Sequence, residues 1–196
     1  MERQPLWTRN FTILTLGTVV SMLGNAISGF ALSLLILDYT GSTLLYAIFM
    51  VVYNLPKIIM PSIAGPYLDR FSRTKAIWTL DYLSAALYLV IFFLLRGGLF
   101  NYALLLGLCI VIGTIDSVYL VAYDSLYPML ISEGNYAKAY SISSMIYPLS
   151  ALMVPIASWC YEHVGLTPLF LFNAATFAIA ATFETQIRVK ETQVST

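Results

Sequence analysis

Long apolar runs separated by short polar breaks dominate the chain. Six segments stay mostly apolar over about 20 residues or more, the length at which a helix crosses the hydrocarbon core of a bilayer. The breaks between them are DYTGS, DRFSRTK, RGGLFN, SEGNYAK and EHVGLTP, and none is long enough to form a soluble domain. The pattern predicts one six-span bundle over residues 1–196, with spans at about 11–37, 43–68, 76–95, 102–128, 139–162 and 167–187.

The spans are expected to be α-helices. Within a bilayer each spanning segment must satisfy its own backbone polar groups, and a helix does so internally. A β-barrel would show alternating segments of about ten residues, and the sequence shows none. The first apolar run is too long for a signal peptide and lacks a clear cleavage site, so we interpret it as a retained span. The fold class is therefore an all-α membrane protein.

Composition agrees with this interpretation and narrows the function. The chain is 59% hydrophobic and 10% charged, with a mean hydropathy of +0.80, which favours a bilayer as its solvent. A formal net charge of zero gives no global attraction for nucleic acid. Cys109 and Cys160 lie in apolar runs and are interpreted as buried thiols, and His163 has no partner cluster. We therefore expect no metal site and no cofactor.

Basic residues predict the orientation. Six spans place both termini on one side, and the side with the excess of Lys and Arg is the cytoplasm. Only Arg96 falls on the other side. Eight basic residues fall on the side of the termini: Arg3, Arg9, Arg70, Arg73, Lys75, Lys138, Arg188 and Lys190. We expect a multi-pass protein of the cell membrane with both termini in the cytoplasm.

The break between the second and third spans, GPYLDRFSRTK, carries the most specific motif. Its residues match in spacing the pattern G-x-x-x-D-[RK]-x-G-[RK]-x-[RK], with Ser72 in place of the second glycine. This stretch resembles motif A of the major facilitator superfamily. The matching positions are Gly65, Asp69, Arg70, Arg73 and Lys75.

The resemblance implies a fold and a function. It implies the amino-terminal six-helix half of a twelve-span transporter, built from two inverted three-helix repeats and working by alternating access. The segment Tyr127–Ile131, followed by Ala137–Ala139, resembles the corresponding loop in exporters of the superfamily. Efflux of small amphipathic compounds by a secondary transporter is the expectation. The partners implied are lipid, a small-molecule substrate and a second six-helix half, as a separate or a missing segment, with a second copy of this chain less favoured.

Motif A residues have two interpretations. Gly65 lets another helix approach closely, and the acid at Asp69 can accept donors from a neighbouring helix N-terminus. In the superfamily the corresponding acid latches the two halves together, and Arg73 can reach an acid at the end of the fourth span, for which Asp124 is the candidate. The alternative is that these residues are solubilising charges at the interface.

Charges inside spans are costly and mark candidate functional positions. Lys57 and Asp116 each lie 14 residues into a span that runs inward, so they sit at a similar depth, about 20 Å down. They either serve transport, with Asp116 as a proton or substrate carboxylate, or form a structural ion pair. Asp81 and Asp124 lie near the cytoplasmic ends of their spans and are interpreted as structural partners of Arg70, Arg73 or Lys75.

One face of the first span carries small and polar residues, namely Gly17, Ser21, Asn25 and Ser28. This stripe either lines a central cavity or allows close helix packing. The Asn25 amide favours the cavity. In a lone bundle the stripe would face lipid and seek a partner.

Two other classes of function are compatible with a six-span chain. A half-transporter that does not transport, acting as a fragment or a membrane interaction subunit, is the alternative to transport. An intramembrane enzyme would need a clustered nucleophile, base or metal set within the spans, and the sequence shows none.

Overall fold

The computed structural model describes residues 5–68, 70–99 and 101–189, and the described residues form helices without strands. Six helical segments are long and apolar enough to cross a membrane. The helices are α1 (Arg9–Thr40), α2 (Thr43–Leu68), α3 (Arg73–Arg96), α4 (Tyr102–Leu126), η1 (Tyr127–Leu130), α5 (Tyr136–Ala151), α6 (Met153–Val164) and α7 (Thr167–Glu184). The all-α, six-span fold class expected from the sequence is confirmed.

Capping residues mark where the helices start and stop. Thr8 begins α1 by accepting a hydrogen bond from the Phe11 N–H at 3.3 Å. Asn101 begins α4 in the same way, accepting from the backbone of Ala103 and Leu104. Gly41, at φ 58°, closes α1 in the left-handed conformation that glycine adopts without steric cost. The polar breaks are therefore helix boundaries.

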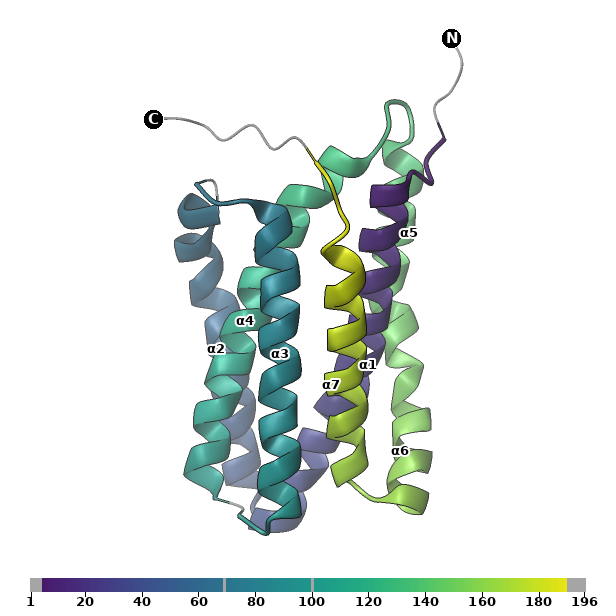
Figure 1. Ribbon diagram of the computed structural model, residues 1–196. Coiled ribbons are helices and arrows are strands. Elements are labelled where there is room, and N and C mark those ends of the chain that lie inside the picture. Colours follow the sequence, from purple (N-terminus) through teal and green to yellow (C-terminus); the bar gives the residue numbers. More distant parts are fainter. Residues whose placement is uncertain (1–4, 69, 100, 190–196) are drawn as a thin grey trace.

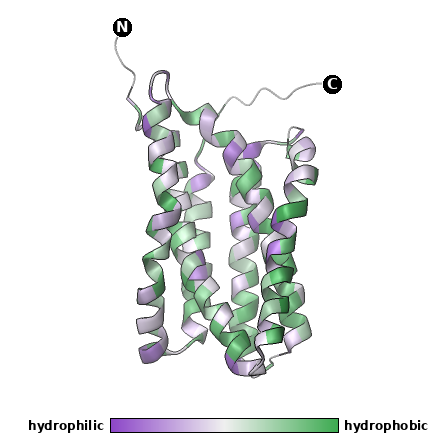
Figure 2. Cartoon of the chain, turned by 180° about the vertical axis from the view of Figure 1, so that it is seen from behind, coloured by the Kyte–Doolittle hydropathy of each residue, from purple (hydrophilic) through white to green (hydrophobic). Residues whose placement is uncertain are grey.

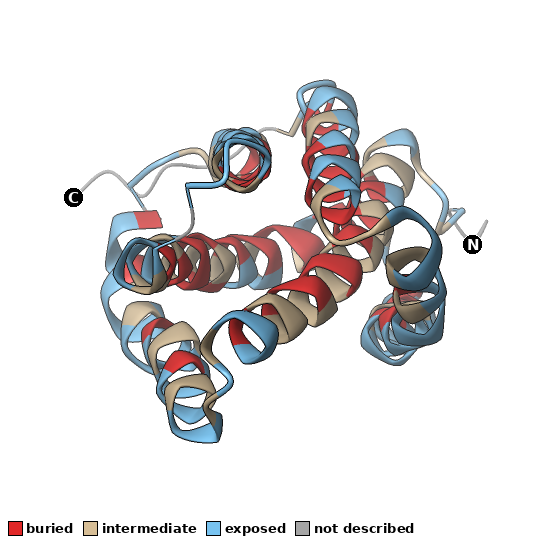
Figure 3. Cartoon of the chain, turned by 90° about the horizontal axis from the view of Figure 1, so that it is seen from below, coloured by how far each residue is buried: buried red, intermediate tan, exposed pale blue. Residues whose placement is uncertain are grey.

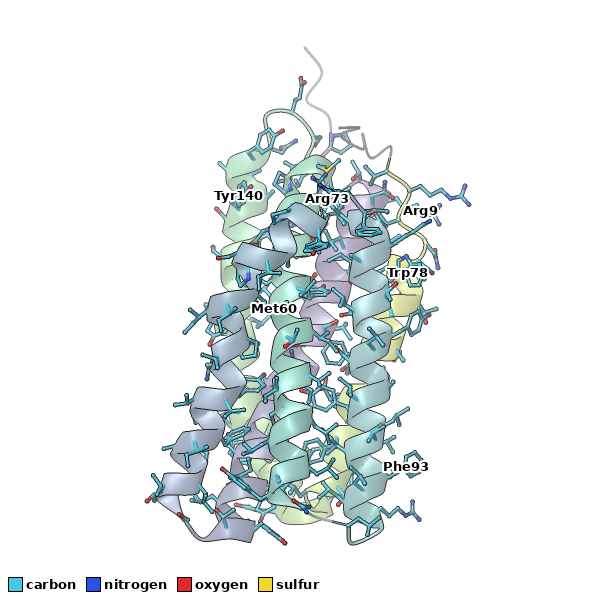
Figure 4. All side chains as sticks on the ribbon, turned by 90° about the vertical axis from the view of Figure 1, so that its left-hand side faces the viewer. Arg9, Met60, Arg73, Trp78, Phe93 and Tyr140 are labelled. Carbon is cyan, nitrogen blue, oxygen red and sulfur yellow. The ribbon has the colours of Figure 1, made fainter. Side chains whose placement is uncertain are left out.

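Successive spans run in opposite directions. Figure 1 shows both chain ends at one end of the bundle, together with the α2–α3 and α4–α5 connections. Arg9 and Arg73 lie near that end, and Phe93 lies near the other (Figure 4). The connections rich in basic residues therefore share one end of the bundle.

The packing repeats in two inverted halves. α2 packs on α4, α3 packs on α4, and α3 packs on α7. In an inverted repeat, α1 corresponds to α4, α2 to the α5–α6 span, and α3 to α7. The corresponding contacts are those of α1 with α5 and α6, of α1 with α7, and of α7 with α3, and all of them are present. Because α1 and α4 run in opposite directions, the repeats are inverted.

The fifth span is interrupted, although the sequence predicts one helix over 139–162. α5 ends at Ala151 and α6 begins at Met153, with Leu152 between them. Pro155 has no N–H to donate to the carbonyl of Ala151 four residues earlier, so the ladder is broken there. By contrast, α2 continues through Pro56, Pro61 and Pro66 as one helix.

Burial is uneven among the helices. Figure 3, seen along the bundle, shows buried residues on the faces where helices meet and exposed residues on the outside. Hydrophobic residues run along the helices (Figure 2), and many large hydrophobic side chains are exposed. The described part of α2 buries only Phe49, Pro56, Ala64 and Leu68, and α6 buries only Ala157. α2 and the α5–α6 span therefore lie at the periphery.

Candidate functional site

A cavity of about 670 Å³ lies at mid-depth between the helices. Every span contributes to its wall, and α1 and α4 contribute many of the residues. Most of the wall is apolar or aromatic. The polar groups that face it include Ser21, Asn25, Tyr53, Lys57, Asp81 and Asp116. Three positions singled out from the sequence, Asn25, Lys57 and Asp116, thus come together on one cavity.

Lys57 and Asp116 do not form the direct ion pair that equal depth suggested. The Tyr53 hydroxyl donates to Asp116 Oδ2 at 3.1 Å, and Lys57 Nζ lies 4.3 Å from the centroid of the Tyr53 ring. Tyr53 precedes Lys57 by one helical turn, so its side chain can contact Lys57 with the ring and Asp116 with the hydroxyl. A cation over an aromatic face is attracted by the ring, and Tyr53 thereby connects ammonium and carboxylate indirectly.

Asn25 joins the same group from α1. The Tyr88 hydroxyl donates to Asn25 Oδ1 at 3.2 Å, and the Asn25 side chain also interacts with the Asp116 carboxylate. The Tyr88 ring stacks on Phe177 at 5.8 Å and is buried. Asn25 is therefore held by α3 and presents its amide to the cavity, the expected side of its helix.

Part of the small-residue stripe on α1 lines the cavity, and part of it allows close helix packing. Ser21 and Asn25 line the cavity. Gly17 packs against Glu184 of α7, and Ser28 is fully buried. The expectation that the whole stripe faces lipid in a lone bundle is wrong, because Glu184 of α7 packs against Gly17, and Asp81 and Tyr88 of α3 bond to Ser21 and Asn25.

Asp81 has a different role from the one expected. Its interpretation as a partner of Arg70, Arg73 or Lys75 is wrong, because its side chain is 1% exposed and accepts from Ser21 Oγ at 3.1 Å. It also meets the carboxyl of Glu184, which the sequence analysis did not single out. Glu184 lies inside the expected span 167–187, and an acid inside a span is the signal that could have identified it.

The motif A loop is described only in part. Asp69 lies outside the described residues. Arg70 and Lys75 are exposed, and Arg73 Nη1 approaches Met129 Sδ at 3.5 Å. Ser72 caps α3 by accepting from the Lys75 N–H at 3.3 Å, which explains how a serine serves where the motif has glycine. Asp124 is exposed on the last turns of α4, and its pairing with Arg73 stays a prediction.

Comparison with known proteins identifies the family. The model of the Major Facilitator Superfamily matches residues 14–193. The chain belongs to the major facilitator superfamily. It is also similar to an uncharacterised MFS-type transporter, YkuC of Bacillus subtilis (strain 168), with 26% identity over 174 residues. That match covers 88% of this chain and 40% of the relative, so the chain spans less than half of the relative's length.

Membership in the superfamily has two consequences. The superfamily consists of membrane transporters and not of enzymes, and this chain matches its model over residues 14–193. Its helices contact lipid, because the six spans leave hydrophobic residues on the outside of the bundle. The resemblance seen in GPYLDRFSRTK is thus confirmed for the family as a whole.

Proposed function

We propose that this bundle moves a small molecule across the cell membrane by alternating access, as the amino-terminal half of a twelve-span secondary transporter. The observation that carries the proposal is the mid-depth cavity on which Asn25, Lys57 and Asp116 converge. Buried charges in a membrane are costly and persist where they serve a function. A polar site at the centre of inverted repeats is the place where a rocking bundle exposes substrate to either side.

The cavity wall suits an amphipathic substrate. Aromatic residues from four different helices, Tyr53, Tyr119, Tyr147 and Phe177, offer flat apolar surface. Lys57 and Asp116 offer charges of both signs, and Asn25 offers an amide. A compound with an apolar ring system and one polar or charged group would match both parts. Export is the proposed direction, on the exporter-like segment Tyr127–Ile131.

A second six-helix unit would complete the cavity and pair with the peripheral spans. α2 and the α5–α6 span bury few residues in this bundle. Among the described residues, no group outside the helix's own backbone lies within 4 Å of the position that a side-chain carbon at Gly65 would take, so another helix can approach there. The proposed partner is a separate or covalently linked second half, and a second copy of this chain is the alternative. Asp69, with Asp124, would latch the two units on the cytoplasmic side.

The site is tested by equilibrium binding of a panel of fluorescent amphipathic dyes to the full chain in lipid nanodiscs. Asp116→Asn and Lys57→Met should each weaken binding of a dye that binds the unmodified chain by about tenfold, the loss of one charge-assisted contact of about 1.4 kcal/mol. Glu162→Gln, which changes an exposed acid at the far end of α6, is the control. If the unmodified chain and the three variants bind the dye with equal affinity, the cavity is not the binding site.

Transport is tested separately in everted membrane vesicles that contain the chain. A pH gradient should drive accumulation of the dye that binds, and Asp116→Asn should abolish it. Accumulation should require a second six-span unit in the same membrane, and mass measurement in mild detergent identifies its presence. Tight binding without accumulation in any such preparation would favour the interaction subunit over the transporter.

A further inference from the structure

Two carboxyl groups, those of Asp81 and Glu184, meet in the interior of the bundle, and Asp81 lines the same cavity as Lys57 and Asp116. Asp81 of α3 is 1% exposed, and Glu184, the last residue of α7, is fully buried. Both carboxyl groups contact the same turn of α1. Gly17 makes room for Glu184, because a side chain there would place its first carbon 2.6 Å from Glu184 Oε1. Ser21, four residues later, contacts Asp81 Oδ2 at 3.1 Å.

The surroundings supply too few hydrogen-bond donors for two carboxylates. Neither oxygen of Glu184 receives a hydrogen bond from a donor in the described part of the chain. Two groups act on Glu184: the Asp81 carboxyl, which in its ionised form can only accept, and the Tyr119 hydroxyl, which also interacts with Thr18 Oγ1 at 3.2 Å. The one hydroxyl proton of Ser21 lies within reach of both Asp81 Oδ2 and the Gly17 carbonyl, at 3.1 and 3.0 Å. One further proton is needed to satisfy the cluster.

No positive charge compensates the pair within the described residues. The titratable groups that act on the two carboxyls, besides each other, are Asp116 and Tyr119 of α4, and neither is a cation. The Tyr119 hydroxyl interacts with Thr18 Oγ1 at 3.2 Å. α1 faces the pair with Gly17 and Ser21, which do not titrate. Two adjacent anions in a low-dielectric interior repel each other strongly.

We propose that Asp81 and Glu184 form a proton-binding site in which the two carboxyls share one proton. The proton supplies the missing donor, so that one carboxyl donates to the other. Asp81 also lines the central cavity, whereas Glu184 does not. The proton therefore enters and leaves through Asp81, and Glu184 is the buried partner that stores it. Loss of the proton would leave two charges between α1, α3 and α7 and would loosen their contact at Gly17.

The test is infrared spectroscopy of the full chain in nanodiscs at neutral pH, following the stretching band of protonated carboxyl groups. The unmodified chain should show such a band, shifted by exchange into D₂O. Glu184→Gln and Asp81→Asn each replace one acid by an amide that donates to the remaining carboxylate, so each should lose the band. Glu133→Gln, at an exposed loop position, should keep it. The measurement needs no transported compound and stands apart from the test of transport.

Three results would overturn the proposal. The first is a chain without the band at neutral pH. The second is a band that keeps its full intensity in both single variants, which would place the proton on another acid such as Asp116. The third is a band that is absent in sodium buffer and appears when choline replaces sodium, which would assign the site to a sodium ion. If neither single variant folds, the double amide variant, in which each amide can donate to the other, decides by loss or retention of the band.

Discussion

At the residue scale, the hydroxyl of Tyr53 organises the charged part of the cavity. It donates to Asp116 at 3.1 Å while its ring lies 4.3 Å below Lys57 Nζ. A carboxylate inside a membrane needs donors, and this bond supplies one from the neighbouring helix. The rise of a helix predicts that Lys57 and Asp116 lie at a similar depth, but only the positions of side chains reveal that Tyr53 contacts both.

Tyr53→Phe should destabilise the protein by about 1 kcal/mol, because it removes one interhelical hydrogen bond in the membrane. In the Asp116→Asn background the same change should cost less, since the acceptor has lost its charge. Thermal unfolding in detergent of the four proteins of this double-mutant cycle measures the coupling. Tyr67→Phe, at an exposed position of α2, is the matched control and should have no effect. Strictly additive losses of stability in the double variant would contradict the Tyr53–Asp116 hydrogen bond.

At the scale of elements, close approach of helices depends on glycines outside the polar motifs. A side-chain carbon at Gly113 of α4 would lie 2.5 Å from the Tyr53 carbonyl oxygen of α2. The same pair of helices is joined by the Tyr102 hydroxyl, which donates to the Leu45 carbonyl at 2.6 Å, and by Ser117, which donates to the Pro56 carbonyl. α2 therefore relies on α4 for much of its attachment.

Gly113→Ala should destabilise the bundle by about 1–3 kcal/mol, because backbone cannot move aside as a flexible side chain can. Gly107→Ala, on the same helix, adds a carbon that meets no neighbouring group within 4 Å in the described part of the chain, the helix's own backbone aside. It should be neutral or stabilising by up to about 1 kcal/mol, since alanine favours the helix. Melting temperatures of the two variants in the same detergent give the comparison. Equal effects would show that α2 and α4 are not held this closely.

Pro155→Ala should join α5 and α6 into one helix, because it restores an N–H that can donate to the Ala151 carbonyl. Hydrogen exchange followed by mass spectrometry should show slower exchange around Leu152. Pro148→Ala lies within continuous α5 and should alter that region less. If the interruption also serves gating, the joined helix should slow transport while it raises stability. Unchanged exchange around Leu152 would mean that the break has another cause.

At the scale of the whole molecule, the distribution of basic residues implies an orientation that can be measured. Phe71 is 63% exposed at the end that carries the termini, and Leu99 is 66% exposed at the other. In a background with Cys109→Ala and Cys160→Ala, a cysteine at Phe71 should be labelled by an impermeant thiol reagent only in everted vesicles. A cysteine at Leu99 should be labelled only in intact cells. The reverse labelling would place both termini outside.

The sequence by itself determined the number of spans, their helical nature and the family. These follow from local properties: apolar length sets the spans, backbone hydrogen bonding requires helices in lipid, and motif A is contiguous from Gly65 to Lys75. Asn25, Lys57 and Asp116 could be singled out because a polar residue within an apolar run is visible without a structure. Their common depth followed from the rise of a helix alone.

The tertiary structure decided which of these residues meet. The rotation of each helix about its own axis decides which of its side chains face a neighbouring helix. Because these helices are apolar on all sides, the sequence does not predict that rotation. Only the structure shows that Asp81 contacts Ser21 and not the basic loop, and that Tyr53 contacts both Lys57 and Asp116. It also shows that Ser21 and Asn25 of the stripe on α1 line the cavity, whereas Gly17 and Ser28 are packed against other helices. Glu184 meets Asp81 across about a hundred residues of sequence, and only the packing of α7 on α1 and α3 brings those carboxyls together.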